Sequence, residues 1–334
     1  MKVAFLDPLE ARAAEFPKKY LTGHDVIVAM ERGKLPDGVE DAEAIVWSSY
    51  PVDRGLIERL PKLKLAQRIG VIRTAGDATA ALSGGVAVSA LPHGVSDRVA
   101  QHALALTLSL VRKLRQGHEG MIAGLNPENM PEEETAAPAV HMNWTGTPDV
   151  DTLNDKTVGI IAFGEIGARY ATMLRPFDVR VLYNKRNRLS PELEDHFGVE
   201  YASLEDVLSQ SDIVTAIIPY SEDSRKMLGM AEFKRMKPGV IFINVGRGNT
   251  VDEQALIAAL QDGTIAYAGL DVFAIEPLPS SNPLLTLPNV VLTPHNAGGV
   301  LGQVNMFERI AENLRRVEAG KRVIMPMSVG DPQF

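Results

Sequence analysis

The chain has 334 residues, of which 45% are apolar and 23% charged, and its formal net charge is −8. This length suffices for two hydrophobic cores, and an acidic balance without a basic block argues against nucleic acid as a partner. The sequence contains no cysteine, which excludes disulfides, thiolate catalysis and cysteine-bound metals. A globular protein of two domains is therefore expected.

The N-terminal part alternates apolar runs with polar or helical stretches. Strands are expected at residues 2–6, 25–29, 44–47, 63–69 and 86–89. Such alternation is typical of a small parallel sheet. The first run is broken at once by Asp7 and Pro8, so it is too short for a signal peptide or a membrane span. We accordingly expect a cytoplasmic protein without a membrane partner.

A long helix over about 97–115 is predicted to leave this first unit. The stretch after it, 116–155, is rich in Gly, Pro, Asn and Glu, which indicates a long excursion rather than a core element. Of the histidines here, His102 is interpreted as a packed residue or subunit contact, and His93 as a secondary candidate for lining a pocket. No two histidines stand four residues apart with an acid between them, so no metal site is predicted.

The motif that opens the second unit is typical of dinucleotide binding. An apolar run at 158–162 leads into a Gly-containing turn, a helix over 165–174 and a second apolar run at 179–183. In such a βαβ unit the pyrophosphate rests on the helix N-terminus, where free N–H groups and the helix dipole attract anions. Gly164 would let the backbone approach the phosphates, and Gly167 would let the helix pack closely on the strand. Ala162 replaces the first glycine of the usual pattern, which requires a negative φ at that turn.

The residues after the second strand of this unit bear on the choice of nicotinamide cofactor. An NAD site usually offers a carboxylate there for the ribose 2′-hydroxyl, whereas this chain places Lys185, Arg186 and Arg188. Cations favour a 2′-phosphate, so NADP(H) is predicted over NAD(H), with NAD(H) as the alternative. The same residues would also suit an ordinary solvated basic loop.

Four further strands are expected at 212–218, 240–245, 266–272 and 290–292, and the last helix, about 299–319, would return to the first unit. Arg247, Glu276 and His295 follow three of these strands, and open α/β sheets bind ligands at the carboxyl ends of strands. A guanidinium clamps a carboxylate, and an imidazole held by a carboxylate transfers the proton that accompanies hydride transfer. The trio therefore predicts reduction of a 2-keto acid.

These motifs, together with the runs at 63–71, 99–106 and 251–256, resemble the D-isomer-specific 2-hydroxyacid dehydrogenase family, near its glyoxylate and hydroxypyruvate reductase branch. The resemblance implies two doubly wound parallel-sheet α/β domains. A Rossmann NAD(P)-binding domain at 102–296 would be inserted into a discontinuous flavodoxin-like substrate domain at 1–101 and 297–334. In the family a segment such as 116–155 embraces a second subunit, so a homodimer is expected.

The resemblance also implies roles for single residues. Arg247 would anchor the substrate, Glu276 and His295 would form the acid/base dyad, Asp271 would partner the nicotinamide end, and Pro219 would line the cofactor cleft. The expected cofactor-binding residues are Gly164, Glu165, Ile166, Gly167, Asn184, Lys185, Arg186, Pro219, Val245, Gly246, Arg247 and Asp271. The expected substrate-binding residues are Val71, Ile72, Arg73, Arg247 and His295.

One loop departs from the family pattern. Where members commonly read Gly-Val-Gly-Tyr-Asp-Asn-Ile-Asp, residues 70–77 have Ile72 in place of a glycine and Arg73 beside it. The family uses this loop to cradle the substrate carboxylate, so Arg73 would bring a charge to the substrate. We hypothesise that Arg73 meets a second anionic group, which would make the physiological substrate a larger dianion.

These observations predict an NAD(P)H-dependent reductase of small 2-keto acids, such as glyoxylate or hydroxypyruvate, that gives D-2-hydroxy acids. Glu276 argues against the formate dehydrogenase branch of the family, which usually carries Gln there. Two alternatives stay open: a phosphite-type dehydrogenase, whose site resembles this one, and a cofactor-sensing binding protein of the same fold.

Overall fold

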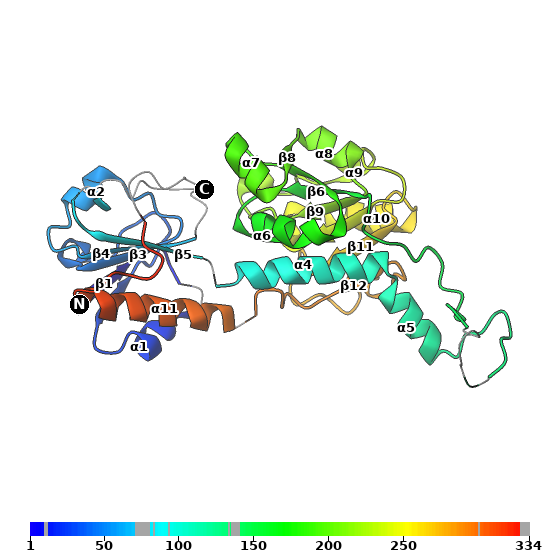
Figure 1. The fold of residues 1–334 in the computed structure, drawn as a ribbon, viewed down its shortest axis with the longest axis horizontal. Helices are drawn as coiled ribbons and strands as arrows, with labels where there is room; N and C mark the ends of the chain where they lie inside the picture. The colour runs from blue at the N-terminus through cyan, green and yellow to red at the C-terminus, as the bar shows by residue number, and fades with distance from the viewer. Residues whose placement is uncertain are drawn as a thin grey trace. The chain divides into compact units, whose positions relative to one another are not determined.

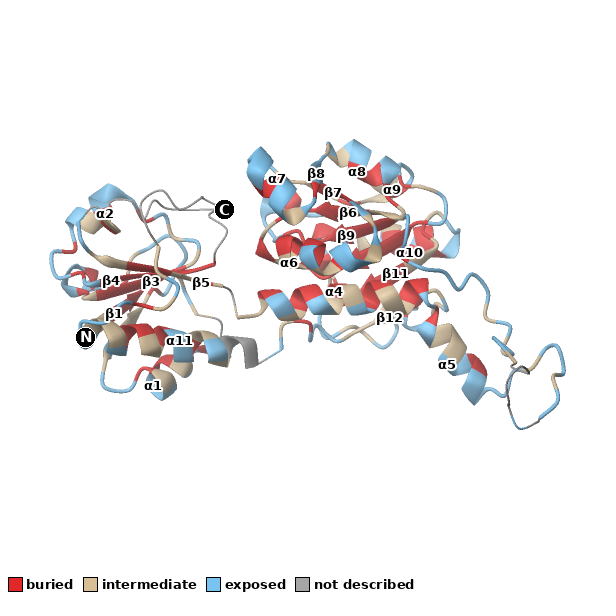
Figure 2. Cartoon of the chain, in the orientation of Figure 1, coloured by how far each residue is buried: buried red, intermediate tan, exposed pale blue. Residues whose placement is uncertain are grey.

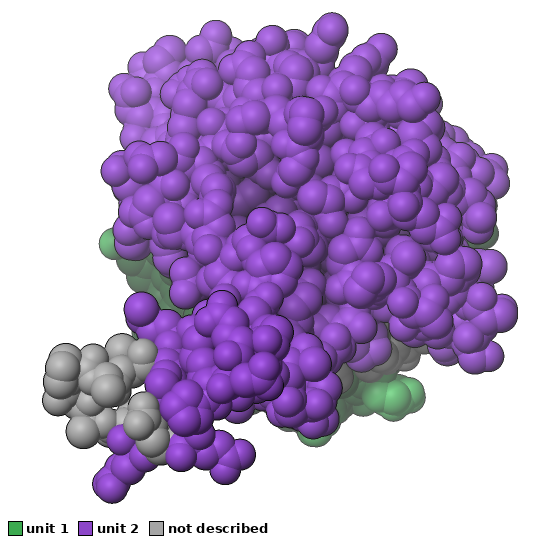
Figure 3. All heavy atoms as spheres, turned by 90° about the vertical axis from the view of Figure 1, so that its right-hand side faces the viewer, with its two compact units in different colours: residues 1–96, 298–334 green, residues 97–297 purple. Residues whose placement is uncertain are grey.

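The computed structural model of the protein describes residues 1–9, 13–70, 81–82, 84–92, 94–132, 134, 141–299 and 301–327, and of 301–303 it describes the backbone alone. Internal contacts divide the chain into two compact units (Figures 1 and 3). The first comprises Met1–Ser96 and Gly298–Phe334, and the second comprises Asp97–Ala297. The second unit is thus inserted in the sequence of the first.

The first unit is built on a five-stranded sheet of parallel strands, in the order β2-β1-β3-β4-β5. The strands are β1 (Lys2–Phe5), β2 (Asp25–Val28), β3 (Ala44–Trp47), β4 (Leu65–Ile69) and β5 (Ala87–Leu91). This is the flavodoxin-like strand order. Every residue of β3 and β4 is buried, as expected for parallel strands covered on both faces (Figure 2).

Helices α1 (Phe16–Tyr20), α2 (Arg54–Glu58) and α11 (Leu301–Glu318) belong to the first unit. Helix α11 brings the end of the chain back to this sheet, as the sequence predicts. Its Phe307, Ile310 and Leu314 are fully buried in one cluster with Phe5 of β1. The rings of Phe5 and Phe307 stack with their centroids 5.7 Å apart. A helical spacing of apolar residues therefore docks α11 on its own unit.

The second unit holds a seven-stranded parallel sheet in the order β12-β11-β10-β9-β6-β7-β8. Its strands are β6 (Thr157–Ile161), β7 (Arg180–Asn184), β8 (Glu200–Tyr201), β9 (Ile213–Ala216), β10 (Ile241–Asn244), β11 (Tyr267–Leu270) and β12 (Val290–Leu292). The direction in which the chain adds strands reverses between β6 and β9, which is the switch point of a Rossmann sheet. The predicted fold class, two parallel-sheet α/β domains, is confirmed.

The helices of the second unit are α4 (Ser96–Val111), α5 (Leu114–Ile122), α6 (Glu165–Leu174), α7 (Pro191–Phe197), α8 (Leu204–Gln210), α9 (Met230–Phe233) and α10 (Glu253–Gln261). The single helix predicted at 97–115 is wrong, because Lys113 adopts a left-handed φ of 52° and separates α4 from α5. The start of the predicted excursion is therefore helical. Across the described residues, no helix is both long and apolar enough to cross a bilayer.

Helix α4 lies directly on the sheet because β11 contains a glycine. A Cβ on Gly269 would lie only 3.1 Å from the Cβ of Leu106 in α4 and 2.9 Å from a methyl group of Ile243 in β10. Real Cβ atoms are rarely this close to their neighbours, so a larger residue at 269 would push the helix outward. The glycine thus fixes the spacing between α4 and the strands that carry the site described below.

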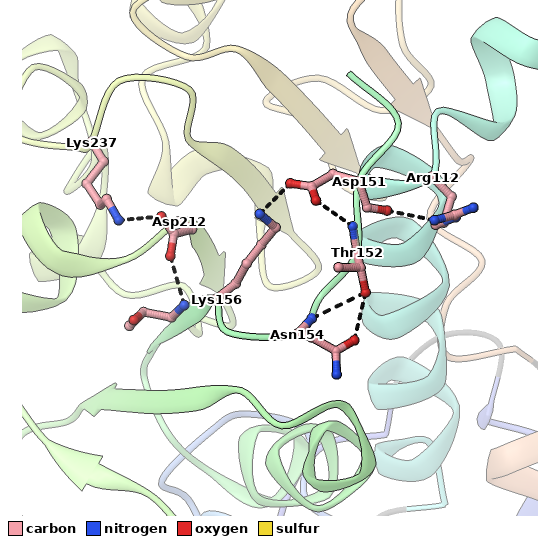
Figure 4. Close-up of polar contacts among 8 residues, drawn as sticks. Arg112, Asp151, Thr152, Asn154, Lys156, Asp212 and Lys237 are labelled. Atoms are coloured by element: carbon pink, nitrogen blue, oxygen red, sulfur yellow. Dashed lines mark hydrogen bonds and ion pairs between the residues drawn. The ribbon is translucent and has the colours of Figure 1, made fainter. Parts of the chain in front are cut away.

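A series of polar contacts holds residues 151–156 against the rest of the second unit (Figure 4). Arg112, just past α4, donates to the carbonyl of Asp151 at 3.0 Å, and the Asp151 carboxylate accepts from Lys156 at 2.5 Å. Asp212 accepts from the N–H at the start of β6 at 2.8 Å and from the ammonium of Lys237. These contacts lie at the amino ends of β6 and β9, which leaves the carboxyl ends of the strands for ligands.

Candidate active site

The polar residues predicted for catalysis lie at the carboxyl edge of the seven-stranded sheet. Arg247 follows β10, Glu276 lies in the loop after β11, and His295 lies in the loop after β12. These three strands are parallel neighbours, so the loops that follow them leave the sheet on the same edge. All three residues belong to the second unit.

Glu276 and His295 are in direct contact. The Nδ1 atom of His295 lies 2.6 Å from Oε2 of Glu276. An ionised carboxylate only accepts, so Nδ1 carries the proton of this bond and Nε2 is left for chemistry. Glu276 is held in turn, because its Oε1 accepts the backbone N–H of Phe273 at 3.0 Å. The side chains of His295 and Glu276 are 38% and 35% exposed, so a small substrate can reach the imidazole.

The loop that carries His295 is held by a buried carboxylate. His295 has a left-handed φ of 51°, a conformation that a residue with a Cβ keeps only where its surroundings impose it. Asp271, 1% exposed, accepts from Oγ1 of Thr293 at 2.6 Å and from the backbone N–H groups of Asn296 at 3.0 Å and Ala297 at 3.1 Å. Donors on both sides of His295 thus converge on one side chain. The predicted contact of Asp271 with the nicotinamide stays a prediction.

Arg247 lies between two glycines, in the sequence Asn-Val-Gly-Arg-Gly at 244–248, and both glycines lie close to the backbone of neighbouring loops. A Cβ on Gly246 would lie 2.6 Å from the backbone N of Ile218, after β9, and a Cβ on Gly248 would overlap the carbonyl of Phe273, after β11. Arg247 is therefore fixed between two close backbone contacts. Its own side chain is exposed, and Nη1 donates to the carbonyl of Gly246 at 2.7 Å.

One further positioning residue was not predicted from the sequence. Glu253, in the first turn of α10, accepts the backbone N–H of Ala274 at 3.0 Å and the side-chain amide of Asn282 at 2.9 Å. It holds the loop from which Glu276 projects. An acid in the first turn of a helix ordinarily only complements the helix dipole, so nothing in the local sequence reveals this longer-range contact.

At the phosphate end of the motif, the expectation for Ala162 is wrong. Its φ is +69°, in the left-handed region, rather than negative. The turn is imposed by β7, because the N–H groups of Ala162 and Phe163 both donate to the carbonyl of Asn184, at 2.9 and 3.2 Å. Gly164 is the N-cap of α6, and a Cβ on Gly167 would lie 3.1 Å from the ring of Phe163, so this glycine permits the close helix packing.

Substituting Ala162 by glycine is expected to stabilise the protein by about 0.5–1 kcal/mol. The relief of roughly 1–2 kcal/mol of left-handed strain exceeds the roughly 0.4–1 kcal/mol that glycine adds to the entropy of the unfolded chain. Urea unfolding of the variant measures the difference. Ala168→Gly, inside α6, is the control and should destabilise by about 1 kcal/mol. Equal destabilisation by the two variants would contradict the strain at Ala162.

The cations after β7 have different environments. Arg188 binds both carboxylate oxygens of Glu194, at 2.8 and 2.7 Å, and its guanidinium lies 5.4 Å from the ring centroid of Tyr201. Lys185 and Arg186, by contrast, have no hydrogen bond or ion pair with any other residue that the structure describes. Burial holds the pKa of the Lys185 ammonium below its ordinary value. Two of the three predicted cations are thus available to an anion.

The other predicted ligand residues lie as follows. The side chain of Asn184 donates to the carbonyl of Ala202 at 3.0 Å, Val245 is buried at the end of β10, and Pro219 is exposed in the loop after β9. Glu165 is buried and Ile166 half-buried in the first turn of α6. Val71, Ile72, Arg73 and His93 lie outside the described residues. Within the part of the chain that is described, no three acidic or histidine side chains are grouped to hold a metal ion.

Comparison with known proteins gives consistent matches. Residues 104–297 match the family model described as "D-isomer specific 2-hydroxyacid dehydrogenase, NAD binding domain". A glyoxylate/hydroxypyruvate reductase B of Klebsiella pneumoniae is 40% identical over 255 residues, which cover 76% of this chain and 74% of that protein.

Solved structures are similar over nearly the whole chain. A glyoxylate reductase from Paecilomyes thermophila is 28% identical with a TM-score of 0.60, and the match covers 98% of both chains. An NADPH-dependent glyoxylate/hydroxypyruvate reductase from Sinorhizobium meliloti, in complex with citrate, is 27% identical with a TM-score of 0.58. That match covers 98% of this chain and 97% of the other.

Proposed function

The chain belongs to the D-isomer-specific 2-hydroxyacid dehydrogenase family, and we propose on this basis how its residues share the reaction. It is an oxidoreductase that acts on CH–OH donors and reduces small 2-keto acids of the glyoxylate and hydroxypyruvate type with NAD(P)H. The observation that carries the proposed roles is the 2.6 Å contact between His295 and Glu276 on the sheet edge that also presents Arg247.

The carboxyl edge of the sheet fits a nicotinamide dinucleotide. The backbone N–H groups at the start of α6 would hold its pyrophosphate, and a Cβ on Gly164 would meet no atom within 4 Å, so the helix N-terminus is open there. Pro219, Gly246 and the loop around Asp271 would line the remainder of the cofactor site. When bound, the reduced nicotinamide supplies the hydride that is added to the substrate carbonyl carbon.

The protein's own residues bind the keto acid and move the proton. The exposed Arg247 guanidinium binds the substrate carboxylate, since its planar donors match two carboxylate oxygens. His295 gives a proton from Nε2 to the carbonyl oxygen as negative charge develops there, and in the reverse reaction it takes that proton back. Glu276 keeps the ring in the tautomer with hydrogen on Nδ1 and stabilises the charged imidazolium electrostatically.

We propose that the enzyme prefers NADP(H), with Lys185 and Arg186 binding the 2′-phosphate. Both cations are unpaired among the described residues, whereas Arg188 is occupied by Glu194. A phosphate beside Lys185 would favour the charged ammonium that burial disfavours. NADPH binding should therefore weaken as the pH rises through the lowered pKa of Lys185.

Lys185→Ala and Arg186→Ala are each expected to raise the KM for NADPH about 10- to 100-fold, the loss expected for one hydrogen bond to a charged group. The KM for NADH should stay within about twofold, because NADH has no 2′-phosphate. Arg180→Ala is the matched control, since Arg180 lies at the other end of β7 and pairs with Glu200. An unchanged KM for NADPH in both variants would contradict the NADP(H) assignment.

We also propose a homodimer formed through α5 and residues 141–150, a surface we call the α5 face. In Figure 1 this part of the second unit lies away from its sheet. It has an open hollow of about 270 Å³. Exposed apolar side chains gathered on one surface mark interaction sites. The α5 face exposes Leu114, Met121, Ile122, Met142, Trp144 and Val150, of which Leu114, Met121, Trp144 and Val150 line the hollow.

In sedimentation velocity, the wild-type protein should sediment as a dimer and the variant Met121→Glu/Trp144→Glu as a monomer. The two carboxylates would replace apolar contact area at such an interface and would have to be desolvated there, which costs free energy. Met30→Glu, at a methionine that is 90% exposed in the first unit, should leave the dimer intact. A monomeric wild type, or a dimer that survives both charges, would refute the assignment of this face. The cytoplasmic location stays a prediction.

A further inference from the structure

We propose that His102, in α4, is a positioning residue that holds the His295 loop in place through Thr293 and Asp271. The proposal rests on the proposed role of His295 as the proton donor. Its basis is a continuous line of hydrogen bonds that starts on a helix, passes through a buried carboxylate and ends on the backbone beside the catalytic imidazole.

The directions of these bonds follow from counting protons. Thr293 has one hydroxyl proton, and at 2.6 Å from Oδ1 of Asp271 it must donate that proton, because a carboxylate only accepts. In its 2.8 Å contact with Nε2 of His102, the Thr293 oxygen is therefore the acceptor. His102 must carry a hydrogen on Nε2, and it donates that hydrogen to Thr293.

The donated hydrogen bond has two consequences for Asp271. First, it occupies one of the two lone pairs of the Thr293 hydroxyl, which orients and strengthens the bond that this hydroxyl gives to the carboxylate. Second, Nε2 of His102 lies 3.5 Å from Oδ1 of Asp271, so its positive hydrogen helps to offset a negative charge that is 1% exposed. His102 itself is 21% exposed, which is partly buried for a histidine on a helix.

The carboxylate passes this constraint to the residues around His295. Asp271 binds Thr293 before the histidine and the N–H groups of Asn296 and Ala297 after it. The left-handed φ of His295, 51°, depends on these bonds, since that conformation is unfavourable for a residue with a Cβ. A loosened carboxylate would let the imidazole move away from the substrate oxygen.

Helix α4 is a suitable fixed point for this line. Leu106, one turn after His102 on the same face of the helix, packs where Gly269 lets α4 lie close to β10 and β11. Since β11 leads directly into Asp271, the helix and the carboxylate share one rigid support. His102 thus ties the loop after β12 to the helix and sheet rather than to another loop.

Three variants separate positioning from packing. His102→Leu removes the donor, His102→Gln keeps an N–H donor, and Thr293→Val removes the hydroxyl while keeping the volume. We expect His102→Leu and Thr293→Val each to lower kcat on the order of 10- to 100-fold, the effect of misplacing a catalytic group by about 1 Å. The Kd for NADPH should change by less than about threefold. His102→Gln should keep most of the wild-type kcat. The double variant His102→Leu/Thr293→Val should have a kcat no lower than that of either single variant.

Amide hydrogen exchange in the protein without substrate provides a readout that does not depend on activity. Exchange at Asn296 and Ala297 should be faster in His102→Leu than in wild type, and normal in His102→Gln. An unchanged kcat, losses that add in the double variant, failure of Gln to restore kcat, or unchanged exchange at these two amides would each overturn the proposal. If the wild type reduces no keto acid, the proposed function fails instead, and the exchange data alone decide whether His102 holds the loop.

Discussion

His295→Ala is expected to lower kcat for keto-acid reduction about 10²- to 10⁴-fold, the range for losing a general acid. The KM for the keto acid should change far less, because the proposed anchor for its carboxylate is Arg247. The Kd for NADPH should stay within about twofold. Steady-state kinetics with glyoxylate and hydroxypyruvate, together with fluorescence titration of NADPH, measure the three quantities.

The kcat of Glu276→Gln should lie between the kcat of the wild type and that of His295→Ala. The glutamine carbonyl can still accept the Nδ1 hydrogen at the position where the carboxylate accepts it at 2.6 Å, but its NH2 group then faces the Phe273 N–H that the carboxylate also accepts. The glutamine also carries no charge to stabilise the imidazolium. His196→Ala, at an exposed histidine of α7, is the control and should leave kcat unchanged. A Glu276→Gln variant with full activity would contradict the role given to the carboxylate.

Gly248→Ala is expected to be among the most disruptive small substitutions in this protein. Its Cβ would overlap the backbone carbonyl of Phe273, so the loop of Arg247 would have to move away from the loop that carries Glu276. We expect the free energy of unfolding to fall by about 3 kcal/mol or more, which would lower the Tm by roughly 6–12 °C. The kcat of the protein that remains folded should also fall.

Gly229→Ala is the matched control for this prediction. Gly229 has an ordinary extended φ of −125°, and the nearest atoms to its Cβ would be 3.7 and 3.9 Å away. Gly229→Ala should lower the free energy of unfolding by less than about 1 kcal/mol. If thermal unfolding showed the same Tm for Gly248→Ala and the wild type, the close contact between the loops after β10 and β11 would be refuted.

Much of the fold could be predicted because the strands are short apolar runs followed by turn residues. The bounds of α6 agree with the sequence prediction, since a glycine turn and an apolar periodicity define both of its ends. The break between α4 and α5 could not be predicted. It occurs at Lys113, a residue without the backbone freedom of glycine or the ring of proline. Lys113 is buried, and its ammonium lies over the ring of Tyr267, a contact that the local sequence does not reveal.

At the candidate site, too, the sequence predicts part of the arrangement and misses the rest. A contact between Glu276 and His295 could be expected from residue types placed after neighbouring strands, but the close approaches of Gly246 and Gly248 are backbone contacts that no side chain signals. Likewise, the sequence counts Arg188 as a free cation, whereas Glu194 binds it in the fold. The sequence predicts a negative φ for Ala162, yet hydrogen bonds to the end of β7 impose a left-handed one.

We propose that this protein reduces a 2-keto acid with His295 as the proton donor. The initial rate of NADPH oxidation by the purified protein with glyoxylate and with hydroxypyruvate, measured beside His295→Ala, tests this proposal. We predict turnover by the wild type that the variant loses. Tight NADPH binding without turnover of either acid would contradict keto-acid reduction, and equal turnover by wild type and variant would contradict the role of His295.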